Sequence, residues 1–206
     1  MNQRLVLGKS RFNEFLIRYN DLHKSGFEEW IFYPGMLFHD PCKWWEDGGV
    51  RYKPHEGLDF CFYRDKAGQN HSLDEKTVIP VMYAGEIIHI DDDFLGKSIY
   101  VTHDICDDRG NRLYVIYGHT NPFHGIGTGK TLNEGDTIAT IADTGKKRAK
   151  IPSHLHISMV WLPESFPYEK LDWETLGDCS TVTFCNPLEF IDCKYKCRGI
   201  SNLYKK

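Results

Sequence analysis

The spacing of hydrophobic and polar positions differs between the first 50 residues and the rest of the chain. Residues 10–25, SRFNEFLIRYNDLHKS, carry apolar side chains at the spacing i, i+3, i+4, i+7 and i+10, which is one face of a helix. These side chains belong to Phe12, Phe15, Leu16, Tyr19 and Leu22. Ser10 is a suitable N-cap, and Gly26 is placed to end the helix. The pattern predicts a helix over residues 10–25 that covers one side of a hydrophobic core.

From about residue 50 onward the chain consists of short apolar segments rich in β-branched residues. The segments VIPVMYAGEIIHI, KSIYVTHDI and RLYVIYGHT have this composition, and DTIATIAD alternates between polar and apolar positions. Both patterns are typical of strands. Residues 106–111, CDDRGN, predict a hairpin turn between two of these segments. We therefore expect a mainly β fold, with an antiparallel sheet crossed by an open groove and the helix packed outside.

The chain length of 206 residues favours one domain with appendages. Residues 163–206 mix Trp, Pro and Cys without a clear period. We expect a helical N-terminal segment over residues 1–45, a β domain over residues 46–162, and a Cys-rich, irregular extension over residues 163–206 that packs on it.

The composition is ordinary for a globular protein, with 41% hydrophobic and 26% charged residues. A net charge of −4 and a pI of about 6.2 give no electrostatic reason to expect nucleic acid or an anionic membrane as a partner. No apolar run approaches the roughly 20 residues of a membrane-spanning helix. The first residues show no signal peptide, because their apolar run, LVLG, is too short. We expect a cell-envelope or extracellular location if a signal peptide has been removed, and a cytoplasmic one otherwise.

The seven cysteines cannot all pair with one another, because their number is odd. Four of them fall in CSTVTFCNPLEFIDCKYKC, residues 179–197. None of the spacings is the Cys-x-x-Cys that is common in structural zinc sites. We expect reduced thiols, or one or two disulfides in this segment.

Two short stretches carry candidate metal ligands. In KPHEGLDF, His55 and Asp59 lie four residues apart, and the neighbouring proline and glycine argue against a helix. In SHLHIS, His154 and His156 would point to the same face of a strand. Imidazole and carboxylate are both ordinary zinc ligands. His55, Asp59 and one histidine of the pair would make a three-ligand site with a fourth position for water, as in catalytic zinc sites.

Four motifs occur in a fixed order along the β-rich part of the chain: H-x-x-x-D, Y-x-H, G-x-x-I-x-x-x-x-x-x-G and H-x-H. They fall at His55 and Asp59, at Tyr117 and His119, at Gly135, Ile138 and Gly145, and at His154 and His156. This series resembles the lysostaphin/LytM-type zinc endopeptidases, metallopeptidase family twenty-three, which cut peptide cross-links in bacterial peptidoglycan.

The resemblance implies a function and a role for each site residue. His55, Asp59 and His156 match the family's zinc ligands, and His119 and His154 match its two catalytic histidines. It further implies one zinc ion per chain, a peptidoglycan peptide as substrate, and a sheet of the duplicated hybrid motif type. The hairpin CDDRGN and the loop YRDKAGQNHSLDEKT, residues 63–77, are long for this family and bear on substrate preference.

Glu56 is a further candidate for the catalytic base, because many zinc peptidases use a glutamate. Strand alternation would turn its side chain away from the face of His55, so we prefer the histidines. His103 is given no catalytic role, because the family often has a non-catalytic histidine at that place.

Three other interpretations compete with this one. The D-alanyl-D-alanine peptidases have a Glu-x-x-His motif, present here as EIIH at residues 86–89, but they space the first histidine and the aspartate more widely. A two-histidine phosphotransfer domain would leave Asp59 unexplained. A catalytically inactive relative that activates other cell-wall hydrolases would lack metal ligands, whereas all five site residues are present.

Overall fold

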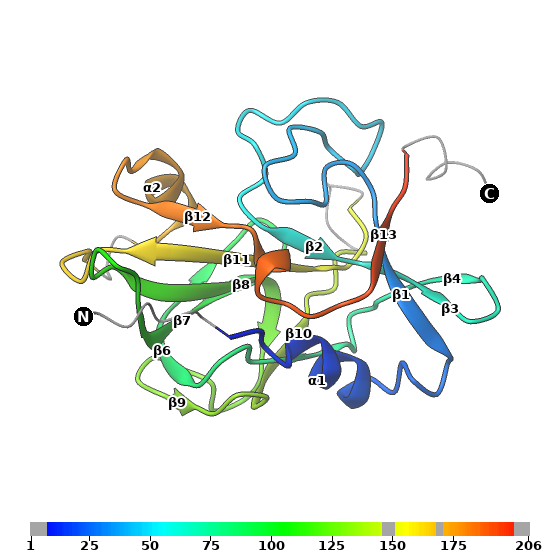
Figure 1. Cartoon of the computed structure of the whole chain (residues 1–206), viewed down its shortest axis with the longest axis horizontal. Helices are drawn as coiled ribbons and strands as arrows, with labels where there is room; N and C mark the ends of the chain where they lie inside the picture. Colours follow the sequence, from blue (N-terminus) through cyan, green and yellow to red (C-terminus); the bar gives the residue numbers. More distant parts are fainter. Residues whose placement is uncertain (1–7, 146–150, 168–170, 200–206) are drawn as a thin grey trace.

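The computed structural model describes residues 8–145, 151–167 and 171–199. These residues form two β-sheets, one α-helix near the N-terminal end and a C-terminal segment with little regular structure (Figure 1). Nearly all strand pairs are antiparallel. The expected mainly β fold, with an N-terminal helix and an irregular C-terminal extension, is confirmed.

The larger sheet has nine strands. They are β2 (Leu58–Phe60), β5 (Val78–Pro80), β6 (Gly85–Asp92), β7 (Lys97–Cys106), β8 (Arg112–Pro122), β9 (Thr131–Leu132), β10 (Thr137–Ile141), β11 (Leu155–Leu162) and β12 (Thr183–Cys185). Six of them follow the order β12-β11-β8-β7-β6-β9, while β2 pairs with β11 and β10 pairs with β5 and β8. β7 and β8 pair on either side of residues 107–111, so the predicted hairpin is confirmed.

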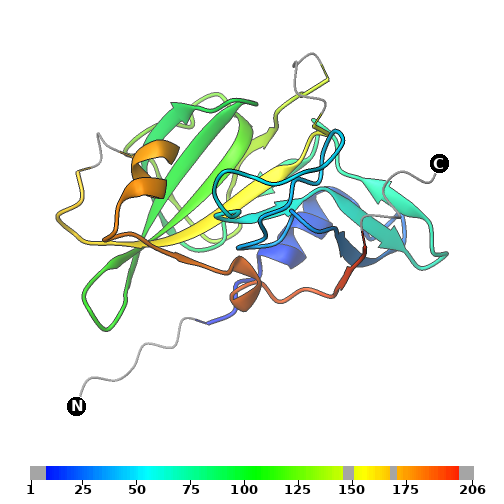
Figure 2. The same cartoon turned by 90° about the horizontal axis from the view of Figure 1, so that it is seen from above.

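The smaller sheet lies at the other end of the molecule (Figures 1 and 2). Its strands are β1 (Phe27–Phe32), β3 (Phe62–Asp65), β4 (Asn70–Ser72) and β13 (Tyr195–Cys197), in the order β13-β1-β3-β4. The pairing of β1 with β13 is parallel. The predicted N-terminal and C-terminal segments thus each contribute a strand to this sheet, and the boundaries of the three segments stay a prediction.

The helix α1 (Phe12–Tyr19) is shorter than the predicted helix over residues 10–25. Asn20 donates from Nδ2 to the carbonyls of Leu16 and Val78, and accepts the Val78 N–H at Oδ1. The next residue, Asp21, has a φ of 54°, in the left-handed region. The bonds to β5 and this backbone conformation end the helix at Tyr19, which short-range periodicity does not reveal.

The predicted N-cap is wrong by one residue, because Arg11 occupies the N-cap of α1 and makes no side-chain cap hydrogen bond. Ser10, the residue before it, still contacts the first turn. Its hydroxyl accepts the N–H of Phe12 at 3.0 Å and donates to the Met82 carbonyl at 2.7 Å. Phe12 and Leu16 are buried. The start of the helix is therefore bound to the segment between β5 and β6, and the helix covers one side of the core.

Both faces of the central strands are buried. One face packs against α1 and the smaller sheet. The other face forms a second cluster with the C-terminal segment, made of Tyr100, Tyr114, Ile116, Val160, Leu162, Leu171 and Leu176. Residues 171–176 include the start of α2 (Trp173–Asp178), which is followed by β12 and by the 3-10 helix η2 (Pro187–Glu189). This segment covers sheet surface that water would otherwise reach.

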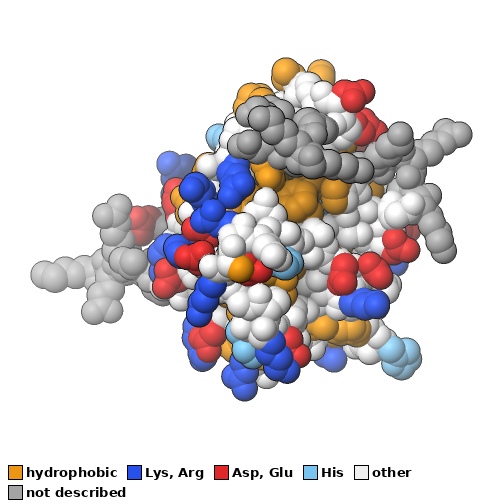
Figure 3. Space-filling view, turned by 90° about the vertical axis from the view of Figure 1, so that its right-hand side faces the viewer, with side chains coloured by type: hydrophobic (Ala, Val, Ile, Leu, Met, Phe, Trp, Pro, Cys, Tyr) orange, Lys and Arg blue, Asp and Glu red, His pale blue; other side chains and the backbone are white. Residues whose placement is uncertain are grey.

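All seven cysteines are free thiols in the structure. Among the described residues no helix has the length and apolar character needed to span a membrane. On the face shown in Figure 3, acidic and basic side chains are interspersed. This agrees with the small net charge of the chain.

Candidate active site

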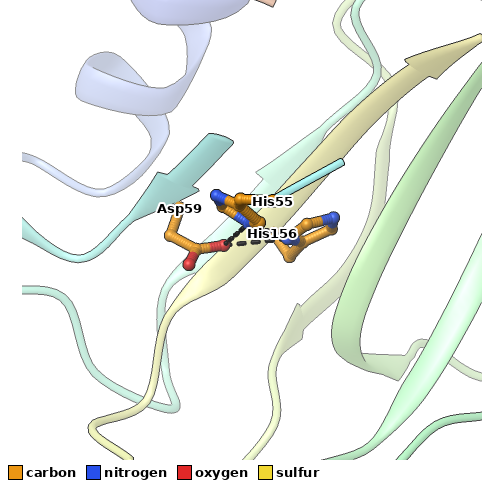
Figure 4. A group of neighbouring side chains, drawn as sticks. All are labelled: His55, Asp59 and His156. Carbon is orange, nitrogen blue, oxygen red and sulfur yellow. Dashed lines mark hydrogen bonds and ion pairs between the residues drawn. The ribbon is translucent and has the colours of Figure 1, made fainter. Parts of the chain in front are cut away.

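His55, Asp59 and His156 meet at the edge where β2 pairs with β11 (Figure 4). In the antiparallel register Asp59 lies directly opposite His156, so their side chains share one face. His55 is supplied by the irregular segment just before β2. Asp59 Oδ1 lies 2.8 Å from His156 Nδ1 and 3.1 Å from His55 Nε2, and the two ring nitrogens are 3.0 Å apart. The two predicted motifs are thus brought to one point.

In His55 and His156, the ring nitrogen that points away from Asp59 has a hydrogen-bond partner, and this partner fixes the tautomer of the ring. His55 Nδ1 faces the Leu37 carbonyl at 3.1 Å, which only accepts, so this nitrogen carries the proton. Ser158 donates its hydroxyl to the Glu56 carbonyl and therefore accepts from His156 Nε2 at 2.8 Å. In the neutral rings, lone pairs on His55 Nε2 and His156 Nδ1 both point toward the Asp59 carboxylate.

This donor set fits a zinc ion. Three acceptor atoms within hydrogen-bond distance of one another repel unless a cation lies among them. Two imidazole nitrogens and one carboxylate oxygen are suitable ligands, and they leave a position for water. Hydrogen bonds from the outer nitrogens to a carbonyl and a hydroxyl are the usual support of metal-bound histidines. The second carboxylate oxygen, Asp59 Oδ2, accepts the Trp44 Nε1–H at 2.7 Å.

Asp59 remains ionised although it is buried. Burial alone would raise its pKa, but without a metal ion among these groups the charge of a protonated His55 or His154 ring and a hydrogen bond donated by His156 hold the pKa well below its ordinary value. Arg51 adds a guanidinium nitrogen 3.6 Å from Asp59 Oδ2. The carboxylate is therefore ready to accept a cation.

His154 lies beside the cluster but outside it. Its Nδ1 donates to the Pro152 carbonyl at 2.8 Å, and its Nε2 is 3.8 Å from Asp59 Oδ1. The Trp44 ring meets the His154 ring edge-on, with centroids 5.0 Å apart. Burial lowers the pKa of His154 to about 3. The neutral ring thus presents an unprotonated Nε2 next to the metal ligands.

His119 approaches from β8, with its ring centroid 4.8 Å from that of His154 and 5.7 Å from that of His156. Its φ is 61°, unusual for a residue other than glycine. Asp93 accepts the His119 backbone N–H at 2.8 Å and contacts His119 Nδ1 at 3.0 Å. The structure thus brings all five predicted site residues together, and their roles remain predictions.

These residues lie in a cleft of about 490 Å³. It is lined by Trp45, Arg51, His55, Glu56, Asp59, Asp91, Asp92, Asp93, Phe94, His119, Ile151, His154, His156, Asp172, Trp173 and Glu174. The end of β6 with the two residues after it, residues 91–94, and the start of α2 contribute to its walls. Neither the hairpin segment at residues 106–111 nor the loop at residues 63–77 lines it, so neither long loop borders this cleft.

The argument from strand alternation about Glu56 is wrong, because residues 55–57 are not in a strand and Glu56 lines the cleft. By contrast, Glu86 and His89 of the rival motif do not line it. Asp93 and Trp173 were missed by the sequence interpretation. The acidic run at residues 91–93 was the only local signal for Asp93, and nothing near Trp173 marked it.

The chain was compared with sequence models of known protein families. The sequence model of Peptidase family M23 matches residues 64–166, half of the chain. The chain belongs to this family. The matched region of this M23 peptidase includes His119, His154 and His156, while His55 and Asp59 precede it. M23 members are metallopeptidases, which agrees with the donor set described above.

Solved structures that are similar to this M23 chain include lysostaphin and a putative M23 peptidase. The solution structure of lysostaphin is 18% identical, with a TM-score of 0.45, over 72% of this chain and 47% of that one. A putative peptidase M23 from Pseudomonas aeruginosa is 21% identical, with a TM-score of 0.38, over 73% and 56% of the two chains. The chain thus spans about half the length of these two proteins. The comparison with curated proteins gave no match.

Proposed function

We propose that this M23 peptidase is a zinc-dependent endopeptidase that hydrolyses peptide cross-links or stem peptides of bacterial peptidoglycan. The observation that carries the proposal is the convergence of His55, Asp59 and His156, with their lone pairs turned inward, beside two further histidines in one cleft. The substrate class rests on the motif resemblance and on family membership. Action on peptidoglycan would require a cell-envelope or extracellular location.

The residues of the cleft have separable tasks in this reaction. When bound, zinc supplies a water of lowered pKa and polarises the carbonyl of the scissile amide. His154, neutral and donating from Nδ1 to the Pro152 carbonyl, accepts a proton at Nε2. His119 delivers a proton from Nε2 to the leaving amine, and the Asp93 carboxylate stabilises the positive charge on its ring.

The proposal is tested with purified protein and peptidoglycans of different cross-link types. We expect about one zinc per chain after reconstitution, and fragments whose masses identify one kind of cleaved amide bond. Protein that takes up no zinc, or that releases no peptide fragment from any peptidoglycan, would overturn it. The digestion also distinguishes a Gly-Gly bridge from a D-alanyl-diaminopimelate cross-link, since both present an amide to the same site.

The inactive, activator-type relative has no observation in its favour. All five site residues line the cleft.

A further inference from the structure

Asp93 occupies an unusual position beside the five site residues. Its side chain is 1% exposed, and each contact of its two oxygens is with a donor group. Oδ1 accepts the N–H groups of Leu95 at 2.9 Å and Gly96 at 2.7 Å, and lies 3.0 Å from His119 Nδ1. Oδ2 accepts the His119 N–H and the Ser98 hydroxyl, both at 2.8 Å. This arrangement is suited to an ionised carboxylate.

The charge of Asp93 is stabilised by the same contacts. Burial alone would raise its pKa, but the bond with the His119 imidazole and the backbone N–H bonds bring the pKa well below its ordinary value. An amide could not replace the carboxylate without loss. Its NH₂ group would face either the Leu95 and Gly96 N–H groups together with the imidazole, or the backbone N–H of His119.

Asp93 also determines the orientation of the His119 ring. Because an ionised carboxylate only accepts, His119 Nδ1 must carry the proton in their shared bond. The other ring nitrogen, Nε2, is then the one left to act in the cleft. The backbone bond to Asp93 supports His119 in its left-handed conformation, which costs a non-glycine residue on the order of 1–3 kcal/mol.

Trp173 extends these contacts to the C-terminal segment. Its Nε1–H donates to Ser98 Oγ at 2.9 Å, and Ser98 in turn donates to Asp93. The same indole meets the His156 ring edge-on, with centroids 5.1 Å apart. Trp173 begins α2 and lies outside the region that the family model matches. A residue beyond the matched β domain thus contacts a candidate metal ligand and is linked to a candidate catalytic histidine by a chain of three hydrogen bonds, through Ser98 and Asp93.

We propose that Asp93 is the positioning residue of His119, held in place by Ser98 and Trp173, and that it keeps the imidazole protonated at Nδ1 with Nε2 available to the substrate. This role rests on the proposed function of His119 as a proton donor at the metal site. Unlike that function, the protonation of the His119 ring can be measured in the resting protein, without substrate.

The first test is ¹⁵N NMR of the zinc-loaded protein with labelled histidine. His119, assigned through its loss in His119→Gln, should show a protonated Nδ1 in the native protein. Asp93→Asn should shift the ring toward the Nε2-protonated tautomer. Asp92→Asn removes the same charge from the neighbouring residue, the last of β6, which pairs with Lys97, and should leave the His119 signals as in the native protein. A native His119 that carries no proton on Nδ1, or an Asp93→Asn spectrum identical to the native one, would overturn the proposal.

The second test is kinetic and uses variants that remove one bond each. Ser98→Ala and Trp173→Phe should lower kcat by about 3- to 30-fold, the loss of one or two hydrogen-bond equivalents, with KM and zinc content nearly unchanged. Ser98→Thr, which keeps the hydroxyl, should recover most of the activity. Asp93→Asn should lower kcat by about 10²- to 10⁴-fold.

The two tests separate this proposal from the proposed function. If the native protein cleaves no peptidoglycan, the proposed function is contradicted. The tautomer of His119 can still be measured in that case, and it tests the positioning role of Asp93 separately. Loss of activity through raised KM or lost zinc, with an unchanged His119 tautomer in all variants, would overturn the positioning role alone. If Asp93→Asn does not fold, the Ser98 and Trp173 variants decide the question.

Discussion

At the scale of single residues, the two histidines of the H-x-H motif look alike in sequence but differ in their surroundings. His156 Nδ1 faces Asp59 and His55, while His154 donates to a neighbouring carbonyl and stays 3.8 Å from the carboxylate. The two rings face the carboxylate of Asp59 with different nitrogens, Nδ1 in His156 and Nε2 in His154. This difference could not be read from the spacing of the motif.

This difference predicts different consequences of mutation. His156→Ala should strip or greatly weaken zinc binding, because one of three ligands is lost. His154→Ala should keep zinc and lose turnover by roughly a thousandfold, a typical value for a missing acid–base group. Zinc analysis and peptidoglycan cleavage of both variants check this. Loss of zinc from His154→Ala, with zinc kept in His156→Ala, would reverse the two roles.

A third variant, His119→Ala, should behave like His154→Ala and retain zinc. If both histidines act on the same transition state, the double variant should be little worse than either single one. Fully multiplicative losses would show that they act in separate steps.

At the scale of elements, the site depends on close contact between the segment before β2 and β11. A Cβ added at Gly57 would lie 2.4 Å from the Ile157 carbonyl oxygen and 2.7 Å from the His156 ring. No real Cβ tolerates such distances to backbone, so the two segments would have to separate. Gly57 thus permits the register that places Asp59 opposite His156.

Gly57→Ala should therefore weaken zinc binding and destabilise the fold by about 1–3 kcal/mol, the usual cost of overpacking. Gly127→Ala is the matched control, because nothing lies within 4 Å of its added Cβ and its φ is not in the left-handed region. Denaturant unfolding and zinc titration of both variants test the idea. Equal zinc affinity in the two variants would contradict it.

The helices and strands also show which features of the fold can be predicted from sequence patterns. The hairpin at residues 106–111 was predicted, because its signal is local. The strand predicted around the H-x-H motif was found as β11, but it begins at Leu155 and contains only His156 of the two histidines. The early end of α1 was not predicted, since it depends on bonds between Asn20 and Val78 in β5. Asp93 and Trp173 were missed for the same reason: their partners, His119 and Ser98, are distant in sequence.

At the scale of the whole molecule, His103 makes stability depend on pH. It is fully buried, its Nδ1 donates to the Ala84 carbonyl, and its Nε2 has no hydrogen-bond partner among the residues that the structure describes. Burial lowers the pKa of His103 from 6.5 to about 4. As the pH falls from 6.5 toward 4, the unfolded chain binds a proton here that the folded protein does not, so the free energy of unfolding decreases.

The full effect corresponds to about 3 kcal/mol, at 1.36 kcal/mol per pKa unit, and is complete below about pH 4. His103→Asn keeps a donor for the Ala84 carbonyl but cannot titrate, so its stability should fall less over this range. His124→Asn, at an exposed loop position, should follow the native protein. Urea unfolding at a series of pH values compares the three. Parallel curves for native protein and His103→Asn would contradict the prediction.

The parallel pairing of β1 with β13 has a consequence for how the molecule assembles. This contact joins segments from opposite ends of the described chain, through Trp30 and Tyr195 among others. Closing so long a loop costs conformational entropy that local hairpins such as β7–β8 do not incur. β13 is also exposed along its whole length. The local hairpins of the large sheet are therefore expected to form before this pairing, which joins the ends of the described chain late in folding.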